Sequence, residues 1–119
     1  MTEDGVRVFE AAVLDWEQHP LFPAIQVKVM ETKASHPAMS LLLVRVGVGG
    51  VIERHTHPVE TETAIAMTGT GVLTWGEDEQ QTPLRAGQGI TIRPGTPHSL
   101  RNTGDAPLEL LAMHTPGIR

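Results

Sequence analysis

Short runs in which apolar and polar residues alternate occupy most of this chain, and glycines and prolines separate them. The 12 glycines and nine prolines recur about every eight to twelve residues, a rhythm typical of all-β sandwiches and barrels. No long amphipathic helix competes with this pattern, and the polar segment 76–81 predicts a hairpin turn. About nine strands are expected, within residues 7–12, 24–31, 39–48, 50–57, 61–69, 70–75, 87–95, 98–104 and 107–116. The predicted fold class is all-β, a closed antiparallel jelly roll.

Length and composition narrow the class of protein. The 119 residues fit one domain over 1–119, with an N-terminal arm over about 1–24 and a barrel over about 25–115. A net charge of −5 with scattered basic residues argues against nucleic acid or membrane as the partner. No apolar run approaches the ~20 residues that span a bilayer. The acidic N-terminus lacks a signal-peptide pattern, so we expect a cytoplasmic location. Without cysteine or tyrosine, any chemistry must come from histidine, carboxylate, hydroxyl and arginine groups.

Two histidines separated by one residue lie in the predicted strand 50–57. Because side chains alternate across a strand, His55 and His57 face the same side. Facing solvent, they would be ordinary surface residues; inside a barrel, each unpaired imidazole would cost about 1–3 kcal/mol. A divalent cation offsets that cost, since imidazole is among its commonest ligands. After Pro58 the chain turns, and Glu62 opens the next antiparallel strand within reach of the same ion.

A second cluster lies in the sequence RPGTPHSLRN, residues 93–102. Pro94, Gly95 and Pro97 predict a tight turn, and His98 follows as the first residue of a new strand. Proline is tolerated at this place, before the ladder needs its N–H group. The turn would direct His98 into the barrel as a third imidazole.

These residues resemble the two motifs of the cupin superfamily, in particular those of small single-domain cupins. The first motif is matched by Gly49, His55, His57, Glu62 and Gly69. The second motif is matched by Gly87, Gly95, His98 and Asn102, with Arg93 where the family usually has proline. The resemblance implies a jelly-roll (double-stranded β-helix) barrel that holds one divalent metal ion through His55, His57, Glu62 and His98. It also implies a homodimer formed through N-terminal strands, and residues 7–12 are the candidate contact.

Three classes of function remain open for such a site. The donor set suits Fe, Mn, Ni, Co or Zn, and no thiolate is present to select Cu(I). We favour a metal-dependent oxygenase that acts on a small organic molecule, with Glu62 as a ligand and catalytic proton acceptor. The alternatives are a redox-neutral isomerase, lyase or decarboxylase, and a non-catalytic protein that binds a small molecule or metal. The fold does not choose among them.

Three further residues are candidate substrate contacts. Arg45 could bind a substrate carboxylate through bidentate hydrogen bonds, although a solvent-facing arginine is the simpler interpretation. Trp75 could form a pocket wall or pack in the core. His114 shares its side of the last strand with apolar residues and is either a structural histidine or part of the pocket. His19 and His36 each precede a proline and are predicted to lie in surface loops.

Overall fold

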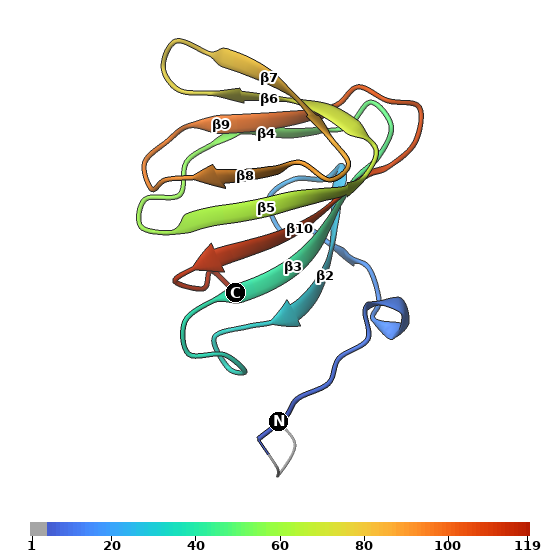
Figure 1. The fold of residues 1–119 in the computed structure, drawn as a ribbon, viewed down its shortest axis with the longest axis vertical. Coiled ribbons are helices and arrows are strands. Elements are labelled where there is room, and N and C mark those ends of the chain that lie inside the picture. Colours follow the sequence, from blue (N-terminus) through green and yellow to red (C-terminus); the bar gives the residue numbers. More distant parts are fainter. Residues whose placement is uncertain (1–4) are drawn as a thin grey trace.

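A computed structural model describes residues 5–119, which form two antiparallel sheets that face each other (Figure 1). The strands are β1 Glu17–Gln18, β2 Ile25–Glu31, β3 Ser40–Val46, β4 Val51–His55, β5 Thr61–Thr68, β6 Thr70–Trp75, β7 Gln80–Arg85, β8 Gly89–Ile92, β9 His98–Asn102 and β10 Leu108–Thr115. The six-stranded sheet has the order β1-β2-β3-β10-β5-β8, and the four-stranded sheet has the order β4-β9-β6-β7. The prediction of an all-β antiparallel fold is confirmed. No helix among residues 5–119 is long and apolar enough to cross a membrane.

Strict alternation in the two central strands places the core between the sheets. In β3 and β10 every second residue is buried, beginning with Ser40 and Leu108, and the strands pair so that Leu110 lies opposite Val44. The inward residues of both sheets form one apolar cluster. Each Leu or Val that is fully buried there stabilises the fold by about 1.5–3 kcal/mol. The same alternation directs His114 of β10 inward among these apolar residues.

Gly69 lies where the chain leaves the six-stranded sheet after β5 and enters the four-stranded sheet as β6. Its φ of +86° is a left-handed conformation, and a Cβ atom there would lie 2.7 Å from the carbonyl oxygen of Pro107. Glycine is therefore required for both the backbone conformation and the close approach. This crossing places β5 and β6 in different sheets.

Three strand expectations differ from the structure, and the first concerns β1, a two-residue strand that was not expected. Residues 7–12 form no strand; they run extended into a short 3₁₀ helix, η1 Ala11–Val13. Side chains rather than a ladder attach this segment to β2, since Arg7 donates to Glu31 at 2.9 Å and Lys28 donates to the Ala11 carbonyl at 2.8 Å. Strand β7 was not expected because Pro83 interrupts its pattern. It forms at the edge of its sheet, where a missing N–H group is tolerated.

Candidate metal centre

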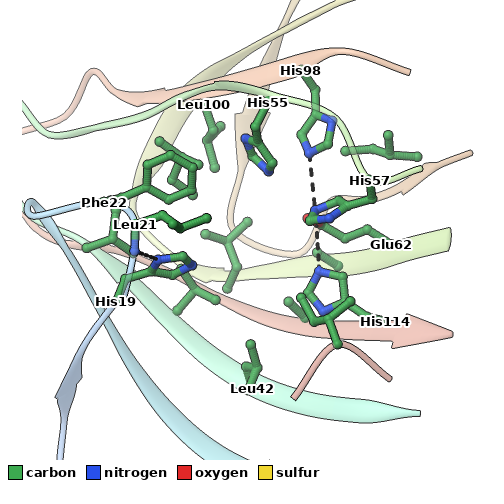
Figure 2. Close-up of a pocket in the computed structure, with 18 of the residues that line it drawn as sticks. His19, Leu21, Phe22, Leu42, His55, His57, Glu62, His98, Leu100 and His114 are labelled. Atoms are coloured by element: carbon green, nitrogen blue, oxygen red, sulfur yellow. Dashed lines mark hydrogen bonds and ion pairs between the residues drawn. The ribbon is translucent and has the colours of Figure 1, made fainter. Parts of the chain in front are cut away.

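Neighbouring strands in each sheet bring the predicted metal ligands together. In the four-stranded sheet, His55 at the end of β4 pairs with His98, the first residue of β9. In the six-stranded sheet, Glu62 of β5 pairs with His114 of β10. His57 lies in the connection between β4 and β5, where the chain crosses from one sheet to the other. Side chains from two facing sheets therefore converge on one region (Figure 2).

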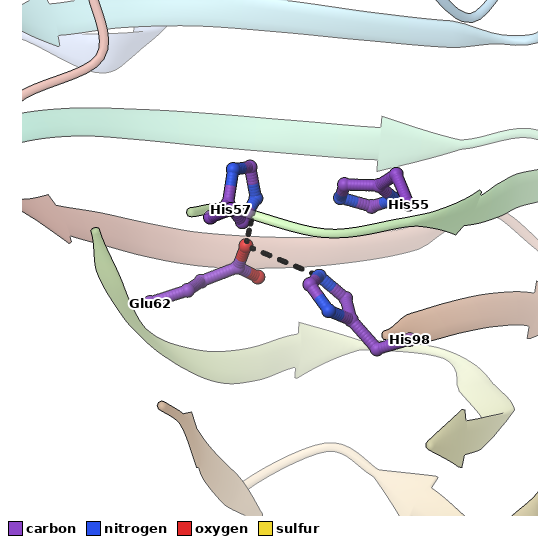
Figure 3. Close-up of side chains that lie close together, drawn as sticks. All are labelled: His55, His57, Glu62 and His98. Atoms are coloured by element: carbon purple, nitrogen blue, oxygen red, sulfur yellow. Dashed lines mark ion pairs between the residues drawn. The ribbon is translucent and has the colours of Figure 1, made fainter. Parts of the chain in front are cut away.

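The four predicted ligands, His55, His57, Glu62 and His98, form a compact cluster (Figure 3). Each offers one nitrogen or oxygen atom, and these atoms all lie within 4.8 Å of one another. Glu62 Oε1 is 3.2 Å from Nε2 of His57 and 3.8 Å from Nε2 of His98. Donors bound about 2 Å from a common ion are separated by about 3–4 Å. The cluster is thus arranged like the metal site that the sequence resemblance implies.

Hydrogen bonds fix the orientation of two of the imidazoles. Nδ1 of His55 donates to the Glu53 carbonyl at 2.8 Å, and Nδ1 of His98 donates to the Thr96 carbonyl at 2.9 Å. Because Nδ1 carries the proton, Nε2 keeps a free lone pair, as in metal-binding histidines generally. Nε2 of His57 and Nε2 of His98 are buried and make no hydrogen bond to any described residue. Buried nitrogens without partners around a carboxylate fit a cation.

The electrostatics of the cluster favour an ionised Glu62. Burial raises the pKa of this carboxyl, but the imidazoles of His114, His57 and His98 lower it more, so its pKa lies well below the usual range. A carboxylate that stays ionised is a good metal ligand and a weak proton acceptor. Burial lowers the pKa of His98, but Glu62 raises it to a net value above normal. The charge of Glu62 thus favours the protonated form of His98. A cation that binds His98 would displace that proton.

The cluster lies on the wall of a cavity of about 340 Å³ between the sheets. This volume is at the lower end of those found for small-molecule sites. Apart from the cluster, the walls are largely apolar, and they include Ile25, Leu42, Val44, Leu73, Ile92 and Leu100. Leu21 lines the cavity and is 75% exposed, so it lies at the mouth. An apolar cavity whose polar residues are gathered at one place is typical of a site for a small organic molecule.

Two further histidines lie at this cavity: His114, whose role the sequence left open, and His19, which was predicted to lie in a surface loop. His114 is buried, and its Nε2 donates to Glu62 Oε1 at 3.0 Å, the oxygen that also faces His57. His19 lies in a loop, as predicted, but it is half-buried against the cavity, and its ring packs 4.8 Å from that of Phe22. The loop before β2 folds back over the cavity mouth, which no local sequence signal indicates.

Arg45 and Trp75, the other predicted substrate contacts, are not among the described residues that line the cavity. The residues of β3 that face the core are even-numbered, so Arg45 projects from the outer face. There its Nη2 pairs with Glu109 at 2.8 Å, and its guanidinium lies 4.2 Å from the ring centre of Trp16. Trp75 is paired in register with His98 and packs against the apolar core. These positions favour the solvent-facing arginine and the core-packed tryptophan, the alternatives to substrate contact that the sequence also left open.

Similar proteins are known for most of the barrel. An uncharacterized protein of Methanocaldococcus jannaschii is 32% identical over 77 residues, or 65% of this chain, which spans 60% of the relative's length. A predicted oxalate decarboxylase of Thermotoga maritima has a crystal structure with a TM-score of 0.81 at 22% identity, covering 92% of this chain and 99% of that chain. The polyketide cyclase RemF of Streptomyces resistomycificus has a TM-score of 0.81 at 14% identity, covering 92% and 79% of the two chains.

The two solved structures share the jelly-roll fold with this chain, and at such low identity they indicate the fold alone. Their names also describe two different reactions, so the architecture accommodates diverse chemistry. The family model described as Cupin domain matches residues 42–114, which include all four clustered residues. This match covers more than half of the sequence, and the chain therefore belongs to the cupin domain family.

Proposed function

We propose that the protein is a metal-dependent enzyme that acts on a small organic molecule, with one divalent cation held by His55, His57, Glu62 and His98. The observation that carries this proposal is the position of these side chains on the wall of an otherwise apolar cavity. Fe, Mn, Ni, Co or Zn suits the donor set. When bound, such an ion would supply Lewis acidity and coordination positions open to small molecules.

The chain's own residues would do the remaining work. The hydrogen bond from His114 holds the Glu62 carboxylate in one orientation, which is how outer partners commonly support a ligand. The apolar walls exclude water from the reacting atoms, which strengthens every electrostatic interaction inside. Phe22 packs 5.1 Å from the ring of His55 and so connects the loop at the cavity mouth to the cluster.

Oxidation of the substrate by O₂ is the reaction that we favour. Three imidazoles and one carboxylate suit Fe(II), and an apolar cavity accommodates O₂, which is itself apolar. Glu62 is the one carboxylate among the described residues that line the cavity. Its depressed pKa favours the role of ligand over that of proton acceptor. Among the described residues that line the cavity, His114 and His19 are the only further side chains that could drive a reaction based on proton transfer alone.

His114 is the observation that supports a second candidate, a redox-neutral isomerase, lyase or decarboxylase. Its Nδ1 is buried and has no hydrogen-bond partner among the described residues, while its Nε2 is held by Glu62. An imidazole with one nitrogen fixed and the other free can accept or return a substrate proton. In that case the cation would polarise a carbonyl group and His114 would move the proton.

Oxygen uptake distinguishes these functions. Protein loaded with Fe(II) is incubated with a panel of small acids, enediols, thiols and phenols, and O₂ is followed with an electrode. We expect uptake that depends on one substrate class and that is lost in His57→Ala protein. Turnover under argon would instead support the redox-neutral enzyme. Tight binding of a panel compound by the metal-loaded protein, without turnover in either gas, would contradict an enzyme and indicate a binding protein.

We further propose that two copies of the chain associate through the outer face of the six-stranded sheet. On this face β5 carries exposed apolar side chains, with Ile65 39% and Met67 52% exposed, and Val8 of the N-terminal segment is 83% exposed. Light scattering after gel filtration should give twice the chain mass of 12.9 kDa. Met67→Glu should give the monomer, whereas Glu77→Gln in the β6–β7 turn should not. A monomeric mass for the unmodified protein at micromolar concentration would contradict the proposal.

A further inference from the structure

Arg119 is a cavity residue whose guanidinium has no hydrogen-bond or ion-pair partner among the described residues. Its side chain lines the cavity, and its Nη2 atom is buried without a hydrogen bond to any described residue. No ion pair involves its guanidinium among residues 5–119. A buried guanidinium nitrogen that lacks an acceptor is unfavourable. A hydrogen-bond acceptor on a molecule that enters the cavity would satisfy this nitrogen.

The backbone before Arg119 is held firmly enough to place its side chain. The amide of Ile118 donates to Ser40 Oγ at 3.1 Å, and the carbonyl of Arg119 accepts from the Lys33 amide at 2.9 Å. Gly117 is buried, and a Cβ atom on it would lie 3.1 Å from the backbone of Met39 and of Ser40. These contacts fix residues 117–119 against the start of β3. The guanidinium is thus directed to the cavity by a packed segment.

Among the described residues, no acidic side chain at the cavity is free to pair with Arg119. Glu62, the one side-chain carboxylate among the described lining residues, already faces three imidazoles. Burial, and next the charge of Arg119, lower the pKa of His19, so His19 is near Arg119 and adds no second positive charge at neutral pH. His19 lies across the cavity from His57 and His98 (Figure 2). With a divalent ion in the cluster, the cavity would carry net positive charge and attract anions.

We propose that Arg119 binds the carboxylate of a small substrate whose apolar body fills the cavity and whose reacting end lies at the metal cluster; the second half of this statement rests on the proposed function. A planar guanidinium matches a carboxylate through two parallel hydrogen bonds. The cavity of about 340 Å³ has one guanidinium and mostly aliphatic walls. It therefore suits a compact monocarboxylic acid better than a sugar or a polyphosphate.

Binding of simple acids and their uncharged analogues tests Arg119 directly. Titration calorimetry compares benzoate with benzamide and butyrate with butyramide, on metal-loaded protein and on His57→Ala protein, in which a carboxylate has no ion to bind. We expect both proteins to bind the acids and not the amides. Arg119→Met should weaken acid binding by about ten- to a hundredfold, and Arg119→Lys should restore part of it. Arg101→Met, which removes an exposed guanidinium on β9, should leave acid binding unchanged.

The outcomes separate this inference from the proposed function. If Arg119→Met protein binds the acids as tightly as the unmodified protein, or if the latter does not distinguish acids from amides, the role of Arg119 is refuted, and oxygen uptake still decides the enzyme. If acid binding depends on Arg119 but no turnover occurs, the result supports Arg119 as the carboxylate-binding residue and contradicts the proposal that the protein is an enzyme. Since Nη2 makes no hydrogen bond within the described chain, ligand-free Arg119→Met protein should melt no lower than the unmodified protein. A markedly lower melting temperature would show a structural role instead.

Discussion

Replacing His57 with alanine is expected to abolish tight metal binding. His57 contributes one of four donor atoms that lie within 4.8 Å of one another, and the connection between β4 and β5 carries no other histidine. Loss of an outer partner alone weakens metal binding about 10–100-fold, so loss of a ligand should weaken it by at least about a hundredfold. Inductively coupled plasma mass spectrometry after dialysis measures the result as ions per chain.

Alanine variants of two other histidines provide the comparisons for this experiment. His36 accepts a hydrogen bond from the Ala38 amide in the loop between β2 and β3, away from the cluster, so His36→Ala should keep the full metal content. His114→Ala removes the hydrogen bond to Glu62 and should give an intermediate affinity, about 10–100-fold weaker. Equal metal content in His57→Ala and His36→Ala proteins would contradict the assignment of His57 as a ligand.

Removing the metal is expected to lower the melting temperature by about 10 °C. A ligand that binds only the folded state stabilises it by about 2.7 kcal/mol when its free concentration is a hundred times its dissociation constant. For a domain of this size, 1 kcal/mol shifts the melting temperature by several degrees. Scanning calorimetry of metal-loaded protein with and without EDTA measures the difference.

His57→Ala protein is the matched control for the chelator, because it should melt at one temperature whether EDTA is present or not. Restoring the divalent ion in excess should restore the melting temperature of the unmodified protein. An unchanged melting temperature after verified removal of the metal would show that the four residues do not hold an ion tightly. The fold itself should survive removal, since its apolar core between the sheets does not include the cluster.

The metal cluster could be predicted because local rules determine most of its geometry. Alternation directs His55 inward at the end of β4, and the turn at Gly95, whose φ is +80°, positions His98 at the start of β9. The short connection from β4 to β5 then crosses between the sheets and places Glu62 near both. One detail differs: β4 ends at His55, so His57 reaches the cluster from a connecting segment rather than from a strand.

Arg45 shows where the same rules fail. Both faces of β3 carry leucines, so alternation alone could not tell the inner face from the outer one. The structure turns Ser40, Leu42, Val44 and Val46 inward and leaves Arg45 outside with Glu109. The hydrogen bond of His114 to Glu62 and the position of Arg119 at the cavity were not predicted, because each depends on a partner or a packed segment distant in the sequence. His114 meets Glu62 only through the register of β5 with β10.

Anomalous diffraction from crystals of the metal-loaded protein, recorded on either side of the absorption edge of the ion, tests the metal centre most directly. We expect a single strong peak between the two sheets, roughly 2.0–2.2 Å from one atom each of His55, His57, Glu62 and His98. The absence of a peak at this position from fully loaded protein, or a peak bound by other side chains, would contradict this expectation.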